Sequence, residues 1–169
     1  RELLDSVHTV GACMADIREL AGNLSQLSAE QIEQLLLSFV DDGEDRAVSR
    51  LLQACAFNEV QLDPTILCRC IGVCEKMPDS APCFALQGGS AIPPLLAASV
   101  VEELSEERKI YAASLATELT VKFGLDPQPV RKVLWKHQQG VLSPYNRVLI
   151  AHSLELLDTD SNPGQPHIP

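Results

Sequence analysis

Four of the six cysteines stand close enough together in the sequence to suggest a thiolate zinc site. Structural zinc sites use pairs of cysteines separated by about two to four residues. The spacing here lacks two such pairs, and in a helix Cys68 lies about 160° around the axis from Cys70. We therefore expect free thiols packed in a core, with no metal and no other cofactor. The four are Cys68, Cys70, Cys74 and Cys83, and the thiol that we expect to be accessible is that of Cys83, in a Pro-rich stretch.

Nucleophilic catalysis would need a histidine base within hydrogen-bond reach of a cysteine or serine. The candidate bases are His8, His137 and His152. None belongs to a nucleophile elbow, a phosphate loop, a dinucleotide-binding fingerprint or a metalloprotease motif. His137 falls on an apolar helix face, where a hydrogen-bonded structural histidine is the ordinary role. We therefore expect that this chain is not an enzyme.

An acidic run around Gly43 has the residue types of a calcium loop but not their pattern. It lacks the alternating ligands and the distal glutamate. Acidic side chains at a helix start also interact favourably with the helix dipole. Two interpretations stay open, a solvated helix cap and a weaker docking patch for a basic partner. The acidic residues are Asp41, Asp42, Glu44 and Asp45.

The single tryptophan, Trp135, is the clearest positional signal for binding. It lies in a predicted helix over 126–139, about 150° around the axis from the centre of the apolar stripe. The stripe consists of Val130, Val133, Leu134 and His137. An outward tryptophan among cations is typical of a binding hot spot, whereas packing on a neighbouring helix or beneath the C-terminal tail is the structural alternative. The candidate partner-binding residues are Arg131, Lys132, Trp135 and Lys136.

The elements that position these residues are helices. Apolar residues make up 46% of the chain and aromatic residues only 4%, which favours helices over aromatic-rich sheets. Five times a leucine precedes a serine or aspartate that can cap a helix N-terminus. These pairs are Leu27-Ser28, Leu62-Asp63, Leu104-Ser105, Leu125-Asp126 and Leu142-Ser143. The chain is therefore predicted to be all-α.

The predicted architecture is a set of antiparallel helical hairpins, stacked as an α-α repeat or an irregular helical bundle of about eight helices. Residues 1–77 form an N-terminal sub-bundle of four helices, and residues 95–158 form a C-terminal one of four. Proline and glycine interrupt residues 78–94, which we expect to be the connector. Residues 159–169 are polar, and we expect a flexible tail.

Two predicted helices carry unusual apolar patterns. The first, over residues 3–24, has a narrow apolar stripe that either packs on the next helices or pairs with a second copy of the chain. This stripe consists of Leu3, Val7, Val10, Met14, Ile17, Ala21 and Leu24. The last helix, over residues 143–158, is apolar around nearly its whole circumference, Val148 included, which predicts burial on several sides.

The cap positions Ser28, Asp63, Ser105 and Ser143 recur every 35 to 42 residues, with other helices between them. This spacing, together with the Leu-Ser or Leu-Asp helix starts, resembles that of HEAT and armadillo-like α-helical repeats over residues 28–158. The resemblance implies a scaffold whose stacked helices present a surface to another protein, and it implies no catalytic residues.

The net charge limits which partners are expected, and the cysteines limit which cellular compartment is expected. The formal net charge is −10, and residues 1–63 hold four Lys and Arg against twelve Asp and Glu. Such a field repels nucleic-acid phosphates, so nucleic acid is an unlikely partner. We expect no membrane span. Free thiols without a secretory signal favour a cytoplasmic or nuclear location, and the chain reads as part of a larger protein.

The predicted function is non-catalytic protein–protein interaction. The chain would act as a scaffold or adaptor domain that binds a partner peptide or helix on a helical surface. The alternative is an RNA-associated helical scaffold of a translation or decay factor, since basic residues surround Trp135.

Overall fold

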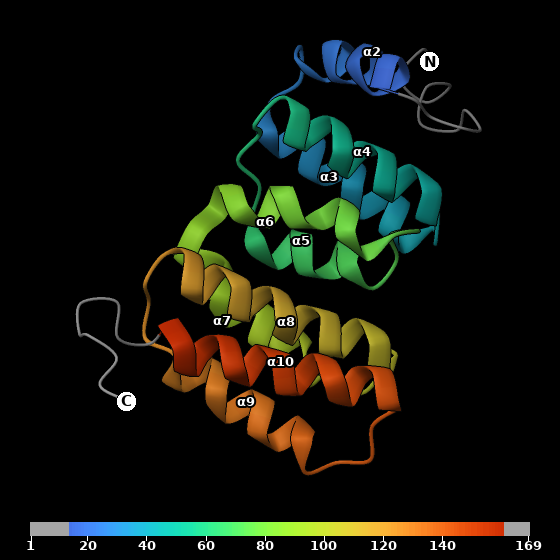
Figure 1. Ribbon diagram of the computed structural model, residues 1–169. Helices are drawn as coiled ribbons and strands as arrows, with labels where there is room; N and C mark the ends of the chain where they lie inside the picture. Colours follow the sequence, from blue (N-terminus) through green and yellow to red (C-terminus); the bar gives the residue numbers. More distant parts are fainter. Residues whose placement is uncertain (1–13, 161–169) are drawn as a thin grey trace. The chain divides into compact units, whose positions relative to one another are not determined.

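The computed structural model describes residues 14–160, and all regular elements among them are helices (Figure 1). No strand occurs in this range, which confirms the predicted all-α class. The chain divides into two compact units, the N-terminal unit Arg1–Gln87 and the C-terminal unit Gly88–Pro169. Within residues 14–160, no helix combines the length and the apolar character needed to cross a membrane.

The N-terminal unit is a stack of helices in which helices two places apart in the chain pack on each other. Its elements are α2 (Met14–Leu24), α3 (Ala29–Asp41), α4 (Asp45–Phe57), α5 (Pro64–Ile71), the 3-10 helix η1 (Met77–Ser80) and α6 (Ala81–Gln87). Helix α4 contacts α2, α3 and α6, and buries apolar side chains along most of its length. Leu51 and Leu52 are fully buried, and because residues 47–52 are all buried, α4 is covered on several sides.

The described part of the first helix is α2, whose apolar stripe packs inside the N-terminal unit against α4. Ile17, Ala21 and Leu24 are buried. The stripe residues before 14, and the side chain of Met14, lie outside the described residues. The part of the stripe that is described is therefore covered by this chain's own helices, the first of the two roles expected for it.

Residues 78–94, the predicted connector, form short helices. They hold most of η1, all of α6, the 3-10 helix η2 (Gly88–Ala91) and the start of α7 (Ile92–Ala98). Their prolines occupy the first turns of these short helices, where a backbone N–H is not needed. Proline therefore sets where each short helix begins, and the boundary between the two units falls inside this segment, after Gln87.

The C-terminal unit is organised around α8. It consists of η2, α7, α8 (Glu106–Lys122), α9 (Gln128–Gln138) and α10 (Pro144–Asp160), and α8 contacts all of the other four. Helix α8 is covered on several sides, and its buried residues are mostly small, including Ala112, Ala113 and Ala116. Small side chains let neighbouring helices approach closely, which explains how α8 occupies the centre of the unit.

Four of the five predicted cap residues directly precede their helices, whereas α9 begins after Pro127, one residue later than the predicted cap Asp126. Ser28 forms a capping box with Gln31, and the Asp63 and Ser105 side chains accept hydrogen bonds from backbone N–H groups in the first turns of α5 and α8. Helices α3 and α8 are followed by Gly43 and Gly124, whose φ angles of 68° and 61° are left-handed. Local hydrogen bonding therefore sets these helix boundaries.

Candidate functional site

Helix α9 presents a tryptophan and two lysines on its exposed side. Val130 and Leu134 are fully buried, and the 3.6-residue helical period then turns the next side chains outward. Trp135 is 50% exposed, and Lys132 and Lys136 are exposed. We call these three residues, Lys132, Trp135 and Lys136, the α9 surface. It combines a large amphipathic ring with two positive charges.

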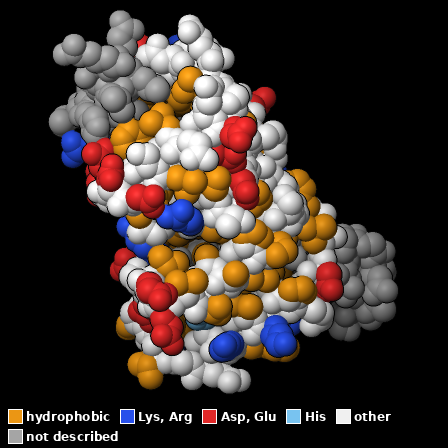
Figure 2. All heavy atoms as spheres, turned by 180° about the vertical axis from the view of Figure 1, so that it is seen from behind, with side chains coloured by type: hydrophobic (Ala, Val, Ile, Leu, Met, Phe, Trp, Pro, Cys, Tyr) orange, Lys and Arg blue, Asp and Glu red, His pale blue; other side chains and the backbone are white. Residues whose placement is uncertain are grey.

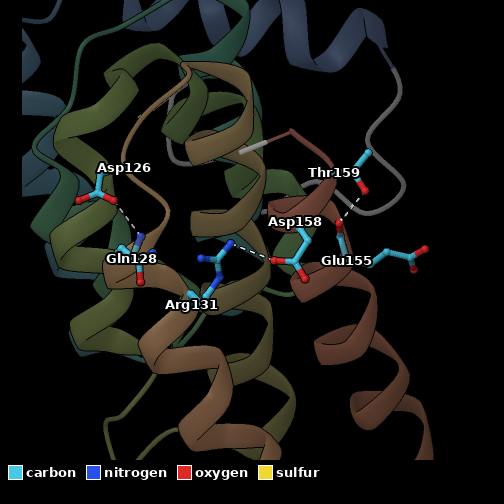
Figure 3. A network of polar contacts seen from close by, with 6 residues as sticks. All are labelled: Asp126, Gln128, Arg131, Glu155, Asp158 and Thr159. Carbon is cyan, nitrogen blue, oxygen red and sulfur yellow. Dashed lines mark hydrogen bonds and ion pairs between the residues drawn. The ribbon is translucent and has the colours of Figure 1, made fainter. Parts of the chain in front are cut away.

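Arg131 was expected to be part of this exposed group, but its side chain is only 14% exposed. Its guanidinium lies 2.9 Å from the carboxylate of Asp158 on α10, and the two helices lie next to each other here (Figure 3). The carboxylate of Asp126, just before α9, accepts a hydrogen bond from the backbone N–H of Gln128, and the hydroxyl of Thr159, at the end of α10, donates to the carbonyl oxygen of Glu155. Arg131 therefore joins α9 to α10 and is not offered to a partner.

A cavity of about 400 Å³ lies on the other edge of α9, next to α8. Its walls come from α8, α9, the end of α7 and the segment before α10. The lining residues are Ser99, Val100, Glu106, Lys109, Ile110, Lys136, His137, Gly140, Val141 and Leu142. We call this the α8/α9 cavity. Lys136 belongs both to it and to the α9 surface.

The charges in the α8/α9 cavity are mainly positive. Burial lowers the pKa of His137, and the nearby ammonium groups of Lys109 and Lys136 lower it further, whereas the backbone of Ser99 acts in the opposite direction. The Nε2 atom of His137 is buried and has no hydrogen-bond partner within the described residues. These effects favour the neutral form of His137, whose imidazole is hydrogen-bonded to the backbone of Ser99 and has Nε2 unpaired within the part of the chain that the structure describes.

The expectation that α10 is buried on several sides is wrong. Ile150 and Leu157 are buried, whereas Val148 is 66% exposed and Tyr145 is 71% exposed. Only one side of α10 packs against α8 and α9, so apolar residues outside that side remain in solvent. On the face drawn in Figure 2, hydrophobic side chains are exposed among acidic and basic side chains.

The acidic residues 41–45 do not form a single open patch. Asp41 pairs with Arg69 at 2.7 Å, and the carboxylate of Asp45 accepts a hydrogen bond from the backbone N–H of Arg46. Glu44 is half-buried and Asp42 is exposed. Much of this charge is therefore used within the N-terminal unit.

The described cysteines are core residues of the N-terminal unit. Cys55, Cys70, Cys74 and Cys83 are fully buried and Cys68 is half-buried. The expectation that Cys83 is accessible is wrong, because α6 packs on α4 and places the Cys83 thiol 3.2 Å from the carbonyl oxygen of Leu52, to which it donates. Within residues 14–160, no three His, Cys, Asp or Glu side chains are grouped as metal ligands require. Cys13 and His8 lie outside the described residues.

These thiols should react slowly in the folded protein. Burial raises the pKa of Cys83 to about 12, and burial together with neighbouring thiols raises that of Cys70 to about 12. Since the thiolate is the reactive form, maleimide labelling at pH 7.5 should be at least about a thousandfold slower than in denaturant. A Cys13→Ser variant removes the one cysteine that is not described. Rapid labelling of Cys83, located by peptide mass spectrometry, would contradict its burial.

The sequence did not reveal the cavity residues contributed by α8, Glu106 and Lys109. They carry no motif, and they meet α9 only because α8 packs beside it. The resemblance to HEAT and armadillo-like repeats stays a prediction about architecture. Comparison with protein-family models, with curated proteins and with solved structures finds no match to this chain.

Proposed function

We propose that this chain is a non-catalytic protein-interaction module, a scaffold or adaptor domain of a cytoplasmic or nuclear protein. It binds a peptide or helix of a partner protein through the α9 surface. The observation that carries the proposal is the exposure of Trp135 between two exposed lysines on a helix that holds no acidic residue. Tryptophan is among the residues that contribute most to protein interfaces, because a large ring is desolvated at little cost in side-chain entropy.

The charges favour an acidic partner at this surface. Helix α9 contains Arg131, Lys132 and Lys136, and of these Arg131 is neutralised by Asp158. Lys132 and Lys136 form no ion pair with any side chain that the structure describes. The acidic residues 41–45 are not included in the proposed site, because Asp41 and Asp45 already have partners in this chain.

Protein is favoured over RNA because of the charge around the α9 surface. Residues 88–169 contain seven Lys and Arg against nine Asp and Glu, so the unit that carries Trp135 is itself slightly acidic. An RNA-binding surface normally needs a wider basic footprint to neutralise phosphates. The test below can also detect RNA binding, which would contradict the proposal.

The test is affinity capture from a cell lysate with the full chain and two variants. Trp135→Ala removes the proposed hot spot, and Phe57→Ala is a matched control, since Phe57 is 49% exposed on the other unit. We expect proteins whose recovery falls by about tenfold or more with Trp135→Ala and is unchanged with Phe57→Ala. Quantitative mass spectrometry measures this recovery, and circular dichroism checks that the variants stay folded.

A direct titration then follows with the purified candidate. Because Trp135 is the single tryptophan of this chain, its fluorescence reports contact with a tryptophan-free peptide of the partner. A shift of its emission on binding supports the proposal. It is contradicted if no captured protein depends on Trp135, or if recovery is lost after ribonuclease treatment.

A further inference from the structure

The α8/α9 cavity brings together two lysines from different helices. Lys109 comes from α8 and Lys136 from α9, and both lie close enough to His137 to disfavour its protonation. Neither lysine forms an ion pair with a side chain in the described part of the chain. Two ammonium groups that line one cavity, neither of them in such an ion pair, attract an anion.

The one carboxylate of the cavity is already engaged. Oε1 of Glu106 accepts a hydrogen bond from the backbone N–H of Ser143, 3.1 Å away, which joins α8 to the start of α10. Glu106 therefore serves as a structural acceptor and offsets only part of the positive charge of Lys109 and Lys136. The cavity keeps a preference for an anionic group.

The other walls of the cavity are apolar and open to solvent. Val141 is 99% exposed and Val100 is 46% exposed, and Ile110 and Leu142 complete this side. A volume of about 400 Å³ lies within the range of small-ligand sites and accommodates two amino-acid side chains. The lining thus suits a carboxylate that stands next to an aliphatic group.

We propose that the α8/α9 cavity receives an acidic side chain of the partner protein, with an adjacent aliphatic side chain against Val100 and Val141. Lys109 and Lys136 bind the carboxylate. The inference rests on the proposed function for the claim that the occupant is a protein, and it adds the chemistry of the segment that is recognised. Lys136 lies next to Trp135 in the chain, so one partner segment can contact both the cavity and the α9 surface.

The cavity can be tested with two probes that differ in a single charge. These are the blocked dipeptides N-acetyl-glutamyl-leucine amide and N-acetyl-glutaminyl-leucine amide, titrated into the isotope-labelled full chain and followed by amide chemical shifts. We expect the acidic dipeptide to shift residues that line the cavity and to bind about 25-fold more tightly than the neutral one, because each of the two lysines contributes about fivefold. Added salt should reduce this difference.

Lysine variants identify the groups responsible. Lys109→Gln and Lys136→Gln should each weaken binding of the acidic dipeptide by about fivefold and leave the neutral one unchanged. Lys122→Gln is the control, because Lys122 is an exposed lysine at the end of α8 outside the cavity. Equal binding of the two dipeptides, or shifts outside the cavity, would overturn the inference.

The dipeptide titration and the capture experiment can succeed or fail independently of each other. Trp135→Ala should leave dipeptide binding unchanged, since Trp135 does not line the cavity. Charge-selective dipeptide binding supports the cavity as a carboxylate site even if no partner is captured. Where a partner is captured, Lys109→Gln should lower the affinity for that partner about fivefold. An unchanged affinity would show that the partner does not use the cavity.

Discussion

Replacing Phe84 with alanine is expected to lower the free energy of unfolding by about 3 to 5 kcal/mol. Phe84 is fully buried in α6, and α6 packs on α4 and α5 within the N-terminal unit. Two terms contribute to this loss. The ring no longer gains free energy by leaving water on folding, and its removal leaves a cavity in the core. Urea unfolding followed by far-ultraviolet circular dichroism measures it.

Phe57→Ala is the matched control for this substitution. Phe57 is 49% exposed at the end of α4, so removing its ring leaves no buried cavity. We expect a change within about 1 kcal/mol. Equal losses of stability for Phe57→Ala and Phe84→Ala would contradict the packing of residues 81–87 in the core of the N-terminal unit.

Leu134→Ala is expected to cost about 2 to 5 kcal/mol in the C-terminal unit. Leu134 is fully buried on the side of α9 that faces the unit, one residue before the half-exposed Trp135. The fluorescence of Trp135, the only tryptophan, reports the unfolding of the unit that contains it. A fall in the urea midpoint of this signal, with little change in slope, is the expected observation.

The neighbouring substitution Trp135→Ala should change stability by less than about 1 kcal/mol, measured by circular dichroism because the fluorophore is absent. The two substitutions together test which side of α9 is buried. If Trp135→Ala destabilises the protein as much as Leu134→Ala does, Trp135 is a core residue. A loss of partner capture would then reflect unfolding, and the proposed function would lose its main support.

Much of the helical framework follows from signals that act within a few residues. Ser28 and Asp63 accept hydrogen bonds from the first turns of their own helices, and Gly43 supplies the left-handed backbone that ends α3. Such bonds join residues only two to four positions apart, so the sequence predicts them without knowledge of the fold. Helical periodicity likewise predicts that Leu134 belongs to the apolar stripe of its helix and that Trp135 lies outside it.

One incorrect prediction, the accessibility of Cys83, arose because proline occurs both in connecting segments and in the first turns of helices. Pro78, Pro82 and Pro93 indicate a connector without a long helix, and in the structure they stand in the first turns of short helices. The sequence therefore predicts an accessible Cys83, but Cys83 lies in the core of the N-terminal unit. Whether a proline ends a helix or begins one depends on what the following turn packs against, which local pattern does not specify.

By itself the sequence determined the helical class, most helix boundaries and the position of Trp135 outside the apolar stripe of its helix, because each depends on hydrogen bonds or side-chain periodicity within one or two turns. The tertiary structure decided that Trp135 is half-exposed and not covered by a neighbouring helix. Only the tertiary structure decided that Arg131 pairs with Asp158, and that Lys109 of α8 shares a cavity with Lys136 of α9. Both depend on residues 27 positions apart in the chain. Helix packing brings them together, and no motif in the sequence records which residues will meet.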